Sequence, residues 1–109
     1  MDICYKTTKI KKLCSIKNEA VKKLGPICAK KLRTRLAEID AANNVMELVA
    51  GRPHPYTGNK TDYFSLDLHG GKRLLFIPLE DPPPTKDDGG IDWFKVDSVV
   101  IEFIGDPHE

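Results

Sequence analysis

The sequence has no long apolar run. No stretch of its 109 residues approaches the roughly 18 consecutive apolar residues that a membrane-spanning helix needs. The first residues lead into a series of lysines, not into the apolar run of about 7 to 15 residues that marks a secretory signal. We therefore expect a cytoplasmic protein that has no membrane partner.

The sequence is also poor in cysteine and in motifs for bound groups. Its three cysteines are an odd number and contain no C-x-x-C pair, which argues against a zinc site or a redox motif. They are Cys4, Cys14 and Cys28. Phosphate-binding loops and the dinucleotide, serine-hydrolase and zinc-protease motifs are missing as well. We expect reduced thiols, no metal and no cofactor.

Charge is balanced overall but unevenly distributed. The net charge is +1, and the length suits one domain, which we place at residues 1–109. Residues 1–35 carry eleven Lys and Arg against two acids, a net charge of +9. Residues 36–109 carry six Lys and Arg against fourteen acids, a net charge of −8. The basic segment predicts a surface for a nucleic acid or an acidic protein, although a merely solvated helix face would carry the same charges.

A long amphipathic helix is predicted after the breaker Gly25-Pro26, because proline is tolerated in the first turn of a helix. Apolar residues then recur every three or four positions and form one stripe. The stripe consists of Ala29, Leu32, Leu36, Ile39 and Met46, with Asn43 as an interruption. The cations off this stripe are expected to face solvent, and they are Lys30, Lys31, Arg33 and Arg35.

The pattern of the second half of the chain predicts a β-sheet. Residues 63–68 alternate as a strand, with Phe64, Leu66 and Leu68 on one face. Residues 69–72 contain paired glycines, which predict a tight turn, and residues 73–77 predict the partner strand of a hairpin.

The remaining elements complete the fold prediction. Residues 3–7 predict a short strand, residues 9–16 a short helix, and residues 80–92 a loop. Residues 96–104 are strongly apolar and predict a final strand at the centre of the sheet. This order implies an α+β fold in which N-terminal helices pack on one face of a small, mostly antiparallel sheet.

Candidate catalytic side chains are few. A histidine exchanges a proton near neutral pH, which makes His54 and His108 acid/base candidates, whereas His69 lies in the predicted turn. Arg73 begins a strand and either grips a phosphate by two hydrogen bonds or forms a salt bridge to Asp67 across the hairpin. The residue pattern leaves both alternatives open.

The end of the chain offers a second pair of polar groups. Asp106 and His108 are two residues apart, so in an extended segment both project to one side. A carboxylate near an imidazole raises its pKa and orients it. The alternative is a frayed polar end of the chain.

Several short motifs occur in an order that resembles a known family. Five short motifs follow one another along the chain. They are a His-Pro at His54, a glycine at Gly58, an aromatic-Ser strand at Tyr63, an Arg followed by apolar residues at Arg73, and an Asp-x-His end at Asp106. This order is similar to that of the plasmid-maintenance killer proteins, the HigB-like toxins of the RelE/ParE superfamily. The segment 32–43 also looks like the corresponding family helix.

The resemblance implies a RelE-like fold and a ribosome-dependent endonuclease that cuts messenger RNA in the A site. The substrate's 2′-hydroxyl attacks the adjacent phosphate, and no metal is needed. Arg73 would hold the phosphate, His54 and His108 would exchange protons, and Asp106 would orient or assist. The residues implied to contact RNA are Tyr63, which would stack on a base, and Lys30, Lys31, Arg33, Arg35, Lys60 and Lys72.

The resemblance also implies partners. It predicts a HigA-like helix-turn-helix antitoxin, and the toxin–antitoxin complex would bind operator DNA. Two alternatives stay open. Thr57 stands where some members have lysine and Pro107 where an aromatic residue is common, which fits a catalytically degenerate homologue that binds an antitoxin and acts as a co-repressor. The other is a ParE-type inhibitor of DNA gyrase.

Overall fold

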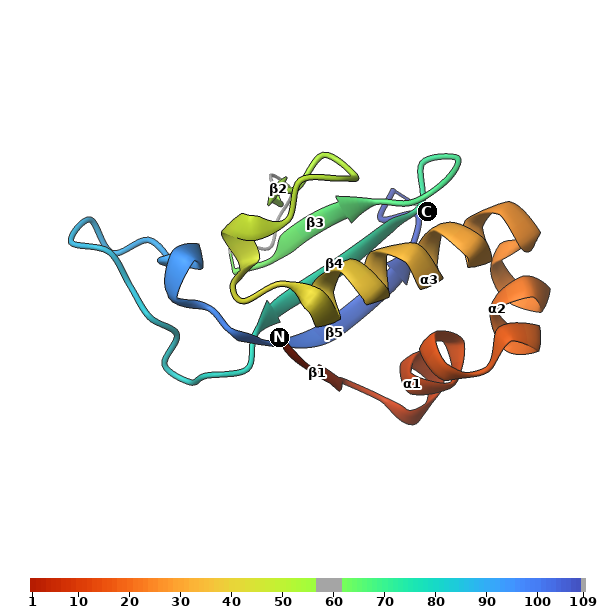
Figure 1. The fold of residues 1–109 in the computed structure, drawn as a ribbon, viewed down its shortest axis with the longest axis horizontal. Helices are drawn as coiled ribbons and strands as arrows, with labels where there is room; N and C mark the ends of the chain where they lie inside the picture. Colours follow the sequence, from red (N-terminus) through yellow and green to blue (C-terminus); the bar gives the residue numbers. More distant parts are fainter. Residues whose placement is uncertain (57–61, 109) are drawn as a thin grey trace.

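The residues that the structure describes form three helices and one five-stranded sheet (Figure 1). The structure, a computed structural model, describes residues 1–56 and 62–108. The strand order in the described part is β1-β5-β4-β3-β2. The strands are β1 Asp2–Tyr5, β2 His54–Pro55, β3 Phe64–Asp67, β4 Arg73–Pro78 and β5 Ser98–Gly105.

The helices begin and end at residues that the sequence marks. The Thr7 side chain accepts a hydrogen bond from the Ile10 amide and so caps the first helix. Gly25, with a φ of 86°, ends the second helix, and Pro26 begins the third. The helices are α1 Thr8–Ser15, α2 Lys17–Leu24 and α3 Pro26–Ala41. None of the helices described here is long and apolar enough to cross a membrane.

The helix predicted at residues 9–16 and the long helix predicted after Gly25-Pro26 are confirmed as α1 and α3. Helix α2 was not predicted, because it is short, highly charged and buries Ala20 alone. The predicted stripe holds through Ile39 and is wrong at Met46. The helix ends at Ala41, and Met46 lies in a separate 3-10 turn, Val45–Glu47, where it is 44% exposed. The Asn44 side chain accepts a hydrogen bond from the Met46 amide and so caps this turn.

The core lies between α3 and one face of the sheet. Leu32 and Ile39 of α3 pack with Leu66, Leu74 and other buried strand residues. Each fully buried side chain of this size contributes about 1.5 to 3 kcal/mol of transfer free energy. The core also contains a cluster of three aromatic rings from β3, β4 and the 3-10 turn Trp93–Lys95: Phe64, Phe76 and Trp93.

The sheet confirms the predicted fold class. The β3–β4 hairpin forms around residues 69–72, and β5 runs antiparallel to β4 but parallel to β1. The last strand is interior but not central, because β4 occupies the middle of the strand order. Leu68 lies beyond the end of β3 and packs partly buried against the core. The fold is therefore α+β, with helices on one face of a mostly antiparallel sheet (Figure 1).

Candidate active site

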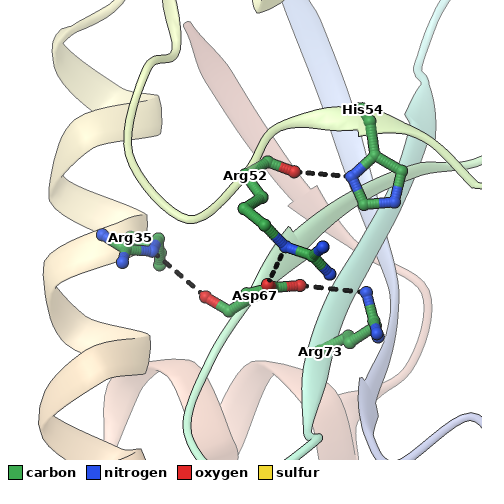
Figure 2. Close-up of polar contacts among 5 residues, drawn as sticks. All are labelled: Arg35, Arg52, His54, Asp67 and Arg73. Carbon is green, nitrogen blue, oxygen red and sulfur yellow. Dashed lines mark hydrogen bonds and ion pairs between the residues drawn. The ribbon is translucent and has the colours of Figure 1, made fainter.

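The β3–β4 hairpin pairs a carboxylate with a guanidinium on the face of the sheet opposite α3. Leu66 and Leu74 belong to the core, so their neighbours Asp67 and Arg73 project to the other face. The two are cross-strand partners, and Arg73 Nη1 donates a hydrogen bond to Asp67 Oδ1 at 2.9 Å (Figure 2). Of the two alternatives for Arg73, the salt bridge is present, and the grip on a phosphate stays a prediction.

A second guanidinium holds the same carboxylate. Arg52 Nε donates to Asp67 Oδ2 at 2.6 Å. Arg52 has a φ of 48°, a left-handed conformation that costs a non-glycine residue about 1 to 3 kcal/mol. In this conformation its guanidinium points to Asp67 and its carbonyl to His54 (Figure 2). Our sequence interpretation missed Arg52, although a cation between a glycine and Pro53-His54 was a usable signal.

The Arg52 carbonyl fixes the tautomer of His54. His54 pairs with Ser65 across β2 and β3, and its Nδ1 lies within hydrogen-bonding distance of the Arg52 carbonyl oxygen. A carbonyl can only accept a hydrogen bond, so Nδ1 carries the hydrogen. The neutral ring then has its lone pair at Nε2, the nitrogen that can take a proton from a substrate.

The environment of Asp67 keeps its carboxyl group ionised. Partial burial by itself would raise its pKa. The hydrogen bond and charge of Arg52, together with the charges of Arg73 and His54, outweigh burial and lower the pKa below its ordinary value. Asp67 is therefore an anion at neutral pH that orders the cations around it, and it is unsuited to act as a general acid.

Two polar atoms beside this cluster lack hydrogen-bond partners among the described residues. They are Ser65 Oγ and Arg73 Nε, both buried. Ser65 pairs with Leu75, so it lies diagonal to Arg73 on the same face of the sheet. Buried polar atoms without a partner are uncommon in folded proteins. The cluster therefore retains a guanidinium N–H that no described residue accepts.

Arg35 is not on the solvent face of α3, which corrects the sequence prediction. The residue is 8% exposed. Its Nε donates to the Asp67 carbonyl oxygen at 3.2 Å (Figure 2). Its Nη1 donates to Glu38 at 2.7 Å. Position 35 follows Cys28 and Leu32 at helical spacing, so it lies on the buried stripe. The charge of Arg35 predicts solvent exposure, whereas its spacing from Cys28 and Leu32 indicates burial.

The close approach of Gly51 locks this arrangement. Asp67 donates its amide hydrogen to the Gly51 carbonyl at 2.7 Å. A Cβ atom on Gly51 would lie 2.5 Å from Arg35 Nε, and the φ of 81° also disfavours any other residue. The end of β3 is thus held on one side by Gly51 and Arg35 and on the other by Arg52 and Arg73.

Residues 106–108 follow β5 and start next to Arg73. Gly105 is the cross-strand partner of Arg73, and Asp106 Oδ2 lies 3.6 Å from the place that a Cβ on Gly71 would take. Asp106 Oδ1 accepts a hydrogen bond from the His108 amide at 2.9 Å. The topology therefore brings Asp106 and His108 to the end of the sheet that carries Arg73. The described hydrogen bond joins Asp106 to the main chain of the exposed His108, and the role of its ring stays a prediction.

Tyr63 is tied to the last strand. Its hydroxyl donates to Glu102 at 3.1 Å, and Lys6 Nζ lies 3.9 Å from the same carboxylate. Partial burial first, and then the hydrogen bond and charge of Glu102, raise the pKa of the Tyr63 phenol. The phenol therefore stays protonated at neutral pH. Stacking of Tyr63 on a base stays a prediction.

The other predicted RNA contacts lie on the surface or outside the described residues. Lys30, Lys31 and Arg33 are exposed, as predicted. Lys72 is half-buried at the end of the β3–β4 turn. Lys60 and Thr57 lie outside the described residues.

A groove of about 360 Å³ opens between α1, α2 and α3. Its apolar lining includes Leu13, Ala20 and Ala29, and its charged lining is basic: Lys17, Lys30 and Arg33. Cys14 also lines the groove, and burial raises the pKa of its thiol to about 12. The groove thus combines an apolar lining with positive charge.

Comparison with known proteins identifies the fold. No family model matches the chain, and no curated protein matches it. The described residues have helices on one face of a mostly antiparallel sheet. Among solved structures, the YoeB dimer from Staphylococcus aureus is similar, with a TM-score of 0.56 at 16% sequence identity over 96% of this chain and 94% of the YoeB chain. This likeness establishes the fold.

Proposed function

We propose that this protein is the toxin of a type II toxin–antitoxin system, a HigB-like endoribonuclease that cleaves messenger RNA in the ribosomal A site without a metal ion. The observation that carries the proposal is the cluster of Arg52, His54 and Arg73 around Asp67, on the face of the sheet opposite α3. The RelE-like fold shared with YoeB and the order of motifs along the sequence support it.

The proposed chemistry uses the substrate's own hydroxyl as nucleophile. His54 Nε2 removes the proton of the 2′-hydroxyl, and the resulting oxygen attacks the adjacent phosphorus. Arg73 and Arg52 stabilise the extra negative charge on the phosphoryl oxygens. His108 protonates the departing 5′ oxygen, and Asp106 orients the segment that carries it. The products are a 2′,3′-cyclic phosphate and a 5′-hydroxyl.

Positive charge on the helices would bind ribosomal RNA. Lys30, Lys31 and Arg33 are exposed on α3, and Lys72 lies near Arg73 at the start of β4. Lys60 belongs to the same proposed set. Such contacts neutralise phosphates and make binding depend on salt concentration. Arg35 acts on this surface indirectly, because its side chain is held inside the protein.

The proposed protein partner is a HigA-like helix-turn-helix antitoxin, and the pair would bind operator DNA. Its acidic segments would meet the basic α3 face and the groove that Lys17, Lys30 and Arg33 line. Apolar side chains of the antitoxin would cover the apolar part of the groove. This accounts for the net charge of +9 in residues 1–35.

A second candidate is a catalytically degenerate homologue that binds the antitoxin and represses transcription. The engagement of both Arg52 and Arg73 by the Asp67 carboxylate favours it, because an anion already occupies the position that a phosphate would take. The active-toxin proposal requires the phosphate to compete with Asp67 or to use the unpaired Arg73 Nε.

The deciding experiment is primer extension on messenger RNA with purified ribosomes. Wild type is compared with Arg73→Ala and with Lys22→Ala, a matched control that removes an exposed cation from α2. We expect ribosome-dependent cuts by wild type and Lys22→Ala that Arg73→Ala loses. Absence of cuts by folded wild type would favour the degenerate homologue, and inhibition of gyrase supercoiling measured in parallel would favour the ParE-type alternative.

A further inference from the structure

A pocket of about 280 Å³ lies at the edge of the sheet, next to the candidate active site. It is formed where β2 and β3 meet the 3-10 turns at residues 45–47 and 93–95. Its lining is largely apolar and includes Phe64, Trp93 and Phe94. Pockets lined by aromatic side chains with a few polar groups are typical small-ligand sites.

Phe94 is the unusual residue of this pocket. Its neighbour Trp93 is 8% exposed and packs against Phe64 with ring centroids 4.8 Å apart. Phe94, in contrast, is 69% exposed. An exposed phenyl group beside a rigid aromatic wall offers a face on which a planar ring can stack.

The polar groups of the pocket fit an uncharged planar ring better than a phosphate. Lys86 and Asp92 bring one cation and one anion to the lining. Asp92 Oδ1 accepts a hydrogen bond from the Phe94 amide at 3.2 Å, which fixes its carboxylate beside the ring. Carboxylates accept hydrogen bonds from the exocyclic amino groups of nucleobases.

The pocket is continuous with the candidate active site through one residue. His54 lines the pocket, and its ring is also hydrogen-bonded to the main-chain carbonyl of Arg52, whose guanidinium binds Asp67. His54 therefore belongs both to the lining of the aromatic pocket and to the cluster that contains the proposed phosphate-binding cations.

We propose that this pocket is a nucleobase subsite, which holds by stacking on Phe94 the base of a nucleotide next to the scissile phosphate. The proposal rests on the proposed endoribonuclease function and adds to it a recognition element at residues 91–95. The phosphate lies at Arg73 and Arg52, the base lies against Phe94, and His54 lies between them. Base selectivity at the cut then depends on this pocket.

Trp93 allows a direct test, because it is the single tryptophan of the sequence and lines the pocket. The probes are the four nucleoside 5′-monophosphates, with ribose 5-phosphate as the control that lacks a base. We expect nucleoside monophosphates to change Trp93 emission in a saturable way and ribose 5-phosphate to leave it unchanged.

Three variants separate stacking from simple apolar contact. Phe94→Leu keeps an apolar side chain without an aromatic face, and we expect roughly tenfold weaker nucleotide binding. Phe94→Tyr retains the ring and should bind like wild type. Val49→Ala is the matched control, because Val49 is an exposed apolar residue, at 88%, that does not line the pocket.

Failure of this proposal is distinct from failure of the proposed function. Equal binding by wild type and Phe94→Leu, or no base-dependent emission change, would overturn the subsite even if ribosome-dependent cleavage is observed. Cleavage with base selectivity that Phe94→Leu loses would support both proposals. Nucleotide binding without cleavage would support the subsite and reject the nuclease. Loss of antitoxin binding in Phe94→Leu, with no response to nucleotides, would assign the pocket to a protein partner.

Discussion

Cations occur in two different settings in this protein. On α3, Lys30, Lys31 and Arg33 extend into solvent. At the end of β3, three arginines converge on one residue: Arg52 and Arg73 bind the Asp67 carboxylate, and Arg35 binds its carbonyl. The first setting provides charge without fixed geometry, which suits a large anionic surface. The second provides oriented guanidinium groups, which chemistry on a single phosphate requires.

The largest expected effect comes from a change at Gly51, which lies against Arg35, one of the three arginines at the end of β3. Gly51→Ala places a Cβ 2.5 Å from Arg35 Nε at a φ of 81°, so we expect a loss of about 2 to 4 kcal/mol in unfolding free energy. Gly70→Ala is the matched control, since its φ is 64° but nothing lies within 4 Å of its added Cβ. Urea denaturation of both variants measures the difference. Equal losses would show that crowding against Arg35 contributes nothing.

Replacement of Arg35 tests its supporting role. Arg35→Met removes the hydrogen bonds to the Asp67 carbonyl and to Glu38, and we expect about 1 to 3 kcal/mol of destabilisation because the carbonyl loses a buried partner. Arg33→Met, on the exposed side of the same helix, should stay within about 0.5 kcal/mol of wild type. Thermal or urea unfolding checks both. Similar stabilities for the two variants would show that the hydrogen bonds of Arg35 contribute no more to stability than the exposed side chain of Arg33.

The charge of Asp67 predicts a pH dependence of stability. Its pKa is lowered in the folded protein from the ordinary value of 3.8, so the carboxylate stabilises the fold at all pH values above that range. This contribution is lost as the pH falls through the lower, folded pKa. Asp67→Asn should therefore be less stable than wild type at pH 7, and the difference should shrink towards pH 2. Urea titrations at a series of pH values measure it, and a constant difference would contradict the proposed ion pairs.

The last prediction concerns the groove between the helices. Burial raises the pKa of Cys14 to about 12, against an ordinary value of 9.0, so its thiolate fraction at pH 8 is lower by about a thousandfold. Alkylation of Cys14 by iodoacetamide should be slower than that of a cysteine peptide by at least this factor. Mass spectrometry of Cys14-containing fragments gives the rate. A rate like that of the peptide would show that the groove lining is open to solvent.

Local patterns predicted most elements of the fold because their causes are local. The Gly25-Pro26 breaker, the alternation at Phe64 and Leu66, and the paired glycines of the turn act within a few residues of themselves. The short strand β2 was not predicted, since its two residues are defined by pairing with β3 and not by an apolar pattern of their own.

The candidate site was predictable only in part, because its geometry is tertiary. The sequence identified His54 from the chemistry of its side chain, and it identified Arg73 and a possible Asp67 partner from their positions in the predicted hairpin. It did not identify Arg52, whose left-handed conformation depends on the surrounding fold, or the inward direction of Arg35. The sequence also contained no signal that one carboxylate would receive both guanidinium groups. Charge patterns indicated where cations are abundant, and the structure was needed to find where they are oriented.

The position of β5 has a consequence for the order in which the molecule can assemble. Among the described strands, β1 is paired with β5 alone, and β5 is the last strand in the sequence. During synthesis from the N-terminus, residues 2–5 therefore cannot join the sheet until residues 98–101 have been made. The β3–β4 hairpin, which carries Asp67 and Arg73, can pair as soon as it is made. The arginine–carboxylate pair is thus a local product of early folding, whereas the closed core that holds it rigid is completed last.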